Sequence, residues 1–299
     1  MNKLAINSYA KVNLFLSVKN KRPDGYHSIE SLFERISLCD RIKLEKRSDK
    51  RIVLRCSDPG LPSGKNNLAV KAALLLSGRY GIKKGVTIDL LKRIPTGAGM
   101  GGGSSNAAAV LSGLNKLWNL DLSQRQLGGL AAKIGSDVPF FVYNCSFALC
   151  EGRGDLIRPL PLLSKRRLWH VIVVPKVHVS TPLIYKHWDK LRANKKISAS
   201  VLTRPASDAK LILLALNRQR PDFGSSGLFN SLEAVTIGLY PQVQDAKQAL
   251  AASGIKTILM TGSGSAVFGI VSSRKEALAF SKQLKAQNRF WSIFVASTV

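Results

Sequence analysis

The sequence predicts an α+β protein made of two domains, and three observations support this expectation. Apolar and polar residues alternate near both ends of the chain, which indicates strands, and segments with helical apolar spacing lie between them. The 299 residues, 45% of them hydrophobic, can form one or two sizeable cores. A basic, weakly patterned stretch covers about 186–226. We therefore expect domains over 1–160 and 161–299.

The N-terminal half opens with an alternating strand over 4–18, which places Lys11 and Asn13 on one face. Proline and glycine at 22–25 predict a turn that leads into the rings of Tyr26 and His27. The next expected elements are an extended region over 36–56, a helix over 68–79 after the cap candidates Asn66 and Asn67, a strand over 86–91, a helix over 104–118 and another helix starting at Asp121 and Ser123.

The C-terminal half alternates more regularly. The expected elements are a strand over 170–174, a helix over 240–253, a strand over 257–260, a second glycine loop over 261–265, a strand over 266–271, a helix over 275–287 and a final strand. This alternation predicts an α+β sandwich.

Several classes of protein do not fit the composition. No apolar run approaches the ~18 residues of a membrane span, and polar residues interrupt the N-terminal segment before a signal-peptide core could form. We therefore expect a cytoplasmic protein. The cysteines, which are Cys39, Cys56, Cys145 and Cys150, have neither zinc-ligand nor disulfide spacing, so reduced thiols are expected.

The chain is strongly basic, with 45 Lys and Arg against 18 Asp and Glu and a formal charge of +27. Such a charge attracts polyanions such as nucleotides, nucleic acid or anionic membranes. The basic residues are spread out, however, with only short clusters at 165–167 and 195–196. We expect solvated surface charge, no obligate nucleic-acid or membrane partner, and a monomer or weak homodimer, with a secondary polyanionic partner left open.

The segment PTGAGMGGGSSNAAA, 95–109, carries five glycines between 97 and 103 and runs into the helix expected from 104. Bare backbone at a helix N-terminus favours an anion, with phosphate the natural ligand. The G-x-G-x-x-G spacing fits a dinucleotide site, but Asp121 follows a helix instead of a second strand. A P-loop would need lysine where Gly103 stands. A third kind of phosphate loop remains, with a close-packed turn as the alternative.

This loop resembles the phosphate loop of the galactokinase, homoserine kinase, mevalonate kinase and phosphomevalonate kinase (GHMP) superfamily. Further motifs occur in the order found in its 4-diphosphocytidyl-2-C-methyl-D-erythritol kinase branch. They are AKVNLFL at 10–16, RPDGYH at 22–27, GSDVPFF at 135–141 and TGSG at 261–264. One departure lies at 230–233, where the usual Asn-Asp-Leu-Glu has serine at Ser231.

The resemblance implies a two-domain GHMP kinase fold, with an N-terminal domain like domain 2 of a small-subunit ribosomal protein and a ferredoxin-like C-terminal domain. It implies transfer of the γ-phosphoryl group of ATP, with Mg²⁺, to the 2-hydroxyl of 4-diphosphocytidyl-2-C-methyl-D-erythritol. That step belongs to the non-mevalonate isoprenoid pathway.

The resemblance makes Asp137 the general base and places Lys11 beside it. This is physically reasonable, because a nearby ammonium keeps a carboxylate ionised and favours charge on the attacking oxygen. The alternative interpretations are a helix cap or turn residue for Asp137 and a strand lysine whose ammonium reaches solvent for Lys11.

The acceptor substrate is expected to use five residues. Asn13 would bond the methylerythritol hydroxyls, Thr181 would approach the acceptor from a loop, and Tyr26, His27 and Tyr185 would form the cytosine site by stacking and by reading the polar edge of the base. An ordinary edge-strand asparagine and exposed loop aromatics are the alternatives.

For ATP, the resemblance places the phosphates on 99–105, with Ser104 and Ser105 near Mg²⁺ and Ser104 as a metal ligand. The adenosine would lie near Asn67 and Lys92. The residues expected to bind ATP are Pro95, Gly97, Gly99, Gly101, Gly102, Gly103, Ser104, Ser105, Asn106, Asn67 and Lys92.

Overall fold

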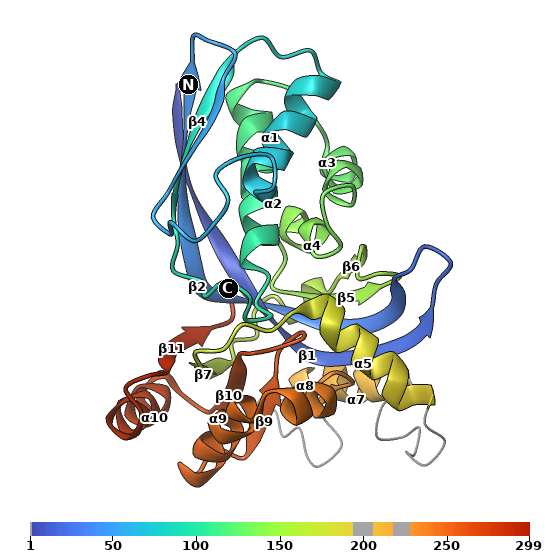
Figure 1. The fold of residues 1–299 in the computed structure, drawn as a ribbon, viewed down its shortest axis with the longest axis vertical. Coiled ribbons are helices and arrows are strands. Elements are labelled where there is room, and N and C mark those ends of the chain that lie inside the picture. Colours follow the sequence, from blue (N-terminus) through green and yellow to red (C-terminus); the bar gives the residue numbers. More distant parts are fainter. Residues whose placement is uncertain (1, 194–205, 218–227) are drawn as a thin grey trace.

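Two β-sheets and the helices that cover them form the molecule, as seen in a computed structural model that describes residues 2–193, 206–217 and 228–299 (Figure 1). The larger sheet has seven strands and the smaller has four. The strands of the larger sheet are β1 (Lys3–Lys21), β2 (His27–Arg47), β3 (Ile52–Cys56), β4 (Gly85–Leu91), β5 (Phe147–Glu151), β6 (Leu156–Pro159) and β8 (Phe229–Asn230).

The larger sheet runs in the order β3-β4-β2-β1-β8, and β5 pairs with β2 and with β6. Strands β1 and β2 form one long antiparallel pair, while β8, far along the chain, pairs in parallel with β1. Strand β1 therefore lies inside the sheet, with neighbours on both sides.

Four helices lie on one face of this sheet (Figure 1). They are α1 (Leu68–Arg79), α2 (Gly102–Leu117), α3 (Gln124–Ala131) and α4 (Val138–Tyr143). Their apolar residues share one core with the strands, because small residues of α2 such as Ala107 and Ala108 allow it to lie close to the sheet. At Gly113 an added Cβ would stand 2.5 Å from Ile6. The sheet thereby fixes the direction of α2.

The smaller sheet is antiparallel in the order β11-β7-β10-β9, with α9 and α10 packed on it (Figure 1). This order is that of a ferredoxin-like domain and confirms the expected fold class. The elements of this half are a short 3-10 helix η1 (Pro161–Leu163), β7 (Trp169–Val174), α5 (Thr181–Ala193), α7 (Ala206–Asn217), α8 (Glu233–Leu239), α9 (Pro241–Ala252), β9 (Thr257–Met260), β10 (Val267–Val271), α10 (Arg274–Gln287) and β11 (Ser292–Ser297).

An apolar cluster joins the two sheets. Phe15 and Leu32 of the larger sheet pack in it with Ile172 and Phe268 of the smaller one. As a result every residue from Ala10 to Val18 is buried, on both faces of β1, although the alternating pattern alone did not predict this. The domain boundary near residue 160 stays a prediction.

Local signals were correct for several helices. Asn67 caps α1 by accepting a hydrogen bond from the amide of Ala69 at 2.9 Å, and Ser123 caps α3 through a capping box with Gln126. The weak pattern over 186–226 gave no sign of regular structure, yet the end of α5 and the helix α7 lie inside this stretch. The rest of that stretch, with the 195–196 cluster, lies outside the described residues. Helix α8 was also missed.

The four cysteines are free, as expected from their spacing. None of the helices in the described part of the chain combines the length and apolar composition that a membrane span needs.

Candidate active site

A cavity of about 1190 Å³ brings the sequence motifs together. Its walls come from β1, the start of β2, the loop before α2, the segment before α4, the start of α5 and the second glycine loop. Every site residue predicted from the sequence lines this cavity except Ser105. Segments that are far apart in the sequence thus meet at one place.

The glycine loop ends at Gly101, which precedes α2 with a left-handed φ of 68°. The helix begins two residues earlier than expected, so Gly102, Gly103 and Ser104 form its first turn. The first amides of a helix have no partner within it, and the helix dipole adds positive potential there. Since all three residues line the cavity, this end of it suits an anionic group.

Ser105 is placed differently. Its amide donates to the carbonyl of Gly101 at 2.8 Å, and its hydroxyl accepts a hydrogen bond from Ser8 at 2.7 Å. The residue is buried against β1, so both of its polar groups are already engaged.

The two glycine loops pack against each other, backbone to backbone. A Cβ on Gly99, whose φ is +75°, would stand 2.2 Å from the carbonyl oxygen of Thr261, and one on Gly262 would stand 2.9 Å from the carbonyl oxygen of Gly99. The amide of Ala266 also donates to the carbonyl of Ala98. Close packing of the two loops therefore accounts for Gly99, and the first turn of α2 is left facing the cavity.

Lys11 and Asp137 meet at the middle of the cavity. The Lys11 ammonium lies 3.7 Å from the carboxylate of Asp137, 2.6 Å from Oδ1 of Asn13 and 4.7 Å from the centre of the Phe33 ring. Burial lowers the pKa of Lys11, and the nearby Asp137 carboxylate raises it, but burial has the larger effect, so the pKa is below its ordinary value. Lys11 is 3% exposed, which rules out a solvent-reaching ammonium. Asp137 precedes α4 but its side chain caps no amide, so its carboxylate is free for the cavity.

Asn13 is also fixed in place. It donates to Ser31 at 2.9 Å and accepts from Thr261 at 3.1 Å in addition to Lys11. Strand β8 pairs with β1 only at Phe15 and Leu16, and at Asn13 the backbone amide donates to the Thr261 hydroxyl at 3.0 Å instead. Asn13 is 2% exposed, so it is a buried residue with several partners and differs from an ordinary edge-strand asparagine.

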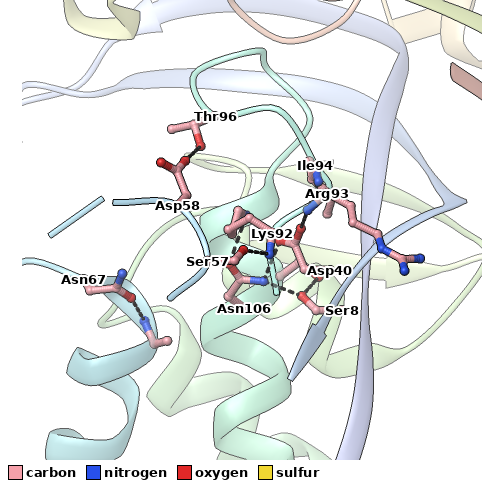
Figure 2. A network of polar contacts seen from close by, with 12 residues as sticks. Ser8, Asp40, Ser57, Asp58, Asn67, Lys92, Arg93, Ile94, Thr96 and Asn106 are labelled. Atoms are coloured by element: carbon pink, nitrogen blue, oxygen red, sulfur yellow. Dashed lines mark hydrogen bonds and ion pairs between the residues drawn. The ribbon is translucent and has the colours of Figure 1, made fainter. Parts of the chain in front are cut away.

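A buried network supports the first glycine loop (Figure 2). Asp40 of β2 is fully buried, and its Oδ1 accepts the amides of Arg93 and Ile94 at 2.6 and 2.9 Å. Its Oδ2 pairs with the Lys92 ammonium and accepts from the Asn106 amide at 2.9 Å. Asp40 thus ties the segment before the glycine loop to helix α2.

The ATP candidates Lys92 and Asn106 therefore play a part in this network. Lys92 also reaches Oδ1 of Asn106 at 3.2 Å, and Asn106 donates to Ser8 at 2.9 Å. Thr96 bonds Asp58 at the opposite side of the loop (Figure 2). Asn67 lies at the start of α1, with its side chain used as the cap and bonded to Pro62.

The other end of the cavity is lined by rings. The rings of His27 and Tyr185 stack with centroids 5.1 Å apart, and Trp188 meets His27 edge-on. Burial raises the pKa of the Tyr185 hydroxyl well above its ordinary value. Tyr26 is 56% exposed, with the Arg153 guanidinium over its ring at 5.0 Å. His27 begins β2 and is buried, so the exposed-loop interpretation holds for Tyr26 alone.

Thr181 begins helix α5, where a loop had been expected, and its hydroxyl shares a hydrogen bond with Ser263 at 2.7 Å. Asn230 holds the second glycine loop by donating to the carbonyls of Met260 and Gly262, both at 2.8 Å. The hydroxyl of Ser231 accepts the amide of Val18 at 2.9 Å, so the serine has a structural role in this chain.

Two carboxylates near the cavity were not predicted from the sequence. Asp40 sits in a strand and Asp189 in a helix, and neither belongs to a recognisable motif. Asp189 bonds Nε2 of His27 at 2.6 Å and Lys21 at 2.8 Å. An acidic residue within the apolar alternation of β2 is the one signal that pointed to Asp40, since buried charges need partners.

Comparison with known proteins identifies relatives of the whole chain. Residues 67–145 match the GHMP kinases N terminal domain and residues 204–289 match the GHMP kinases C terminal. The chain is 43% identical to the 4-diphosphocytidyl-2-C-methyl-D-erythritol kinase of Shouchella clausii, over 90% of this chain and 86% of the relative. It is 38% identical to the enzyme of that name from Macrococcus caseolyticus, over 93% and 94%. A solved 4-(cytidine 5'-diphospho)-2C-methyl-D-erythritol kinase matches 98% of both chains with a TM-score of 0.79 and 34% identity.

Proposed function

The chain belongs to the 4-diphosphocytidyl-2-C-methyl-D-erythritol kinases of the GHMP kinase family, and from this premise we propose how its own residues perform the reaction. The γ-phosphoryl group of ATP passes to the 2-hydroxyl of 4-diphosphocytidyl-2-C-methyl-D-erythritol, which gives the 2-phosphate and ADP in the non-mevalonate isoprenoid pathway. The observation that supports these roles is the Lys11–Asp137 pair, which lies between a phosphate-type helix terminus and an aromatic site.

Asp137 acts as the general base. Its carboxylate lines the cavity and has no capping role, so it can accept the proton of the 2-hydroxyl as the oxygen attacks the γ-phosphorus. Lys11 keeps that carboxylate ionised and stabilises negative charge on the attacking oxygen. Asn13, fixed by Ser31 and Thr261, presents its amide beside Lys11 and orients the methylerythritol hydroxyls.

The phosphates of ATP lie on the first turn of α2, where the amides of Gly102, Gly103 and Ser104 donate to them. The packing of Gly99 on Thr261 holds the loop in this form before ATP arrives, so little reorganisation is needed on binding. Lys92, fixed by Asp40, and Asn67 flank the adenosine.

Mg²⁺ fits this site as an ion carried by the nucleotide. In the described residues no cluster of three or more His, Cys, Asp or Glu side chains could hold a metal by itself. Mg²⁺ commonly takes one or two protein oxygens and completes its shell with phosphates and water. The Ser104 hydroxyl at the phosphate end would hold it. When bound, Mg²⁺ neutralises charge on the phosphates.

The cytidine occupies the aromatic end, where Tyr26 and Tyr185 provide stacking surfaces and His27 faces the polar edge of the base. Thr181 borders the acceptor. Since all these residues come from one chain, we propose a monomer or weak homodimer that works in the cytoplasm, where its co-substrate ATP is found.

The test is a kinase assay on Asp137→Asn with Asp89→Asn as the matched control. Both carboxylates are about one-third exposed and pair with one cation, at 3.7 and 3.9 Å, but Asp89 lies outside the cavity. We expect Asp137→Asn to lower kcat about a thousandfold with the KM values little changed, since general bases contribute on this order. Asp89→Asn should match the wild type.

A substrate panel decides the acceptor. The wild-type protein should consume ATP with the diphosphocytidyl compound and not with mevalonate, homoserine or galactose. Turnover that survives Asp137→Asn, or a preference for another alcohol, would contradict the proposal.

A further inference from the structure

His27 is held by three neighbours from helix α5. Its ring stacks on Tyr185, meets Trp188 edge-on and bonds Oδ1 of Asp189 through Nε2 at 2.6 Å. Only about 5% of the His27 side chain is exposed, yet it lines the cavity. The ring is therefore confined, and the polar edge it presents to a ligand is determined by its surroundings.

The Asp189 carboxylate is ionised at neutral pH. Burial pulls its pKa upward, but hydrogen bonds from Lys21 and His27 together hold the pKa below its ordinary value. An ionised carboxylate only accepts hydrogen bonds. The proton of a neutral His27 ring must then be on Nε2, which leaves Nδ1 with a lone pair and no proton.

Among the described residues the His27 ring makes a hydrogen bond through Nε2 and none through Nδ1. A lone acceptor at the edge of a base site distinguishes two bases of the same shape. The amino group at position 4 of cytosine donates to such a nitrogen, whereas the carbonyl oxygen at position 4 of uracil would bring a second lone pair against it.

We propose that Asp189 is a positioning residue that selects cytosine over uracil by fixing the proton of His27 on Nε2, so that Nδ1 accepts the amino group of the base. This inference rests on the proposed function for the location of the base but not for the phosphoryl transfer. Asp189 acts through His27 and itself bonds Lys21 on its other oxygen, at 2.8 Å. The carboxylate is thus anchored at both oxygens, which fixes its direction toward the ring.

The alternative is that Asp189 merely ties α5 to the β1–β2 turn. Lys21→Met provides the matched control, because it removes the other arm of the same tie and leaves the His27–Asp189 bond in place. Asp189→Asn is nearly isosteric, but an amide can either accept from Nε2 or donate to it. It therefore releases the choice of His27 tautomer while keeping the shape of the site.

Two measurements test the proposal. The first is nitrogen NMR of the histidine rings, which reports the protonated nitrogen directly; the chain has four histidines, so His27 is assigned with a His27→Gln variant. The second is calorimetric binding of CDP and of UDP with a non-hydrolysable ATP analogue filling the nucleotide site. Neither measurement depends on turnover.

We expect the wild type to show the proton on Nε2 and to bind CDP about tenfold or more tightly than UDP, the effect of one hydrogen bond exchanged for an unpaired acceptor. Asp189→Asn should reduce this ratio to about threefold, mainly through weaker CDP binding. Lys21→Met should keep the ratio, whatever it does to both affinities. A proton on Nδ1 in the wild type, or an unchanged ratio in Asp189→Asn, would overturn the inference. If the wild type shows no turnover but keeps its preference for CDP over UDP, the result would count against the proposed phosphoryl transfer and not against this inference.

Discussion

The two ends of the cavity are built in different ways. At the phosphate end the groups that matter are backbone amides and glycines, supported from behind by the buried residues Asp40 and Asn106 (Figure 2). At the base end they are side chains near the surface, where Tyr26 is 56% exposed and the Asp189 side chain 30%. The phosphate end is therefore built into the buried core, whereas the base end lies near the surface.

This difference has a functional meaning. Phosphate is common to every ATP-dependent kinase, and amides at a helix terminus can bind it only if the fold holds them rigidly. Discrimination among acceptor alcohols needs side chains that can differ between relatives without disturbing the core. Substitutions at the phosphate end should therefore affect folding strongly, while those at the base end should affect recognition far more than folding.

The largest effect is expected for Asp40→Asn. The substitution leaves the Lys92 ammonium, which is 8% exposed, without its counter-charge, and breaking one half of a buried pair costs about 3–5 kcal/mol in the free energy of unfolding. Urea unfolding followed by circular dichroism measures it. The double variant Asp40→Asn, Lys92→Met should lose less than Asp40→Asn alone, because no unpaired charge remains. If the double variant is less stable than Asp40→Asn, the unpaired Lys92 charge is not the cause of the loss of stability.

Gly99→Ala should come next. The new Cβ would stand 2.2 Å from the carbonyl oxygen of Thr261 at a φ of +75°, so strain and overpacking together should cost about 2–4 kcal/mol of unfolding free energy and weaken ATP binding. Gly103→Ala is the control, since its nearest neighbour would be Leu68 at 3.5 Å and its backbone is helical. If both variants unfold at the same urea concentration, the two glycine loops do not depend on each other.

Tyr26→Ala tests the base end. Loss of one stacking surface should raise KM for the diphosphocytidyl substrate about tenfold, with KM for ATP and the unfolding free energy unchanged because the ring is mostly exposed. Tyr80→Ala removes a ring of 37% exposure outside the cavity and should leave all three quantities as they are. A loss of stability in Tyr26→Ala would remove the distinction between the two ends.

Much of the fold could be predicted from the sequence because its signals are local. The Asn67 cap, the Ser123 capping box and the alternation of β1 each act within a few residues. The start of α2 was misplaced because glycine is a poor helix former, yet Gly102 and Gly103 open this helix. The resemblance placed Ser105 near the phosphates, whereas its hydroxyl is bonded to Ser8 within the fold.

The remaining features depend on contacts that no local pattern encodes. Asp40 and Lys92 are 52 residues apart, and His27 and Asp189 are 162 apart. Asp40 is one of four acidic residues in β2 and Asp189 is the one acid in the basic helix α5, so neither spacing nor composition distinguishes them. Their importance follows only from the partners that the fold brings to them.

The smallest effects are expected in the dependence of stability on pH, and their pH ranges differ between Lys11 at the centre of the cavity and Asp189 at the base end. The pKa of Lys11 is lowered from 10.5, so between its folded pKa and 10.5 the unfolded chain holds more protons and the unfolding free energy of the wild type should rise with pH relative to Lys11→Met. The pKa of Asp189 is lowered from 3.8, so its contribution is complete above 3.8 and is lost as pH falls through the folded pKa, relative to Asp189→Asn. Urea unfolding at pH 3–10.5 measures both differences. If the unfolding free energies of Lys11→Met and the wild type change with pH in the same way through the alkaline range, the Lys11 ammonium is less desolvated than its burial implies. The centre of the cavity would then resemble the base end more than the phosphate end.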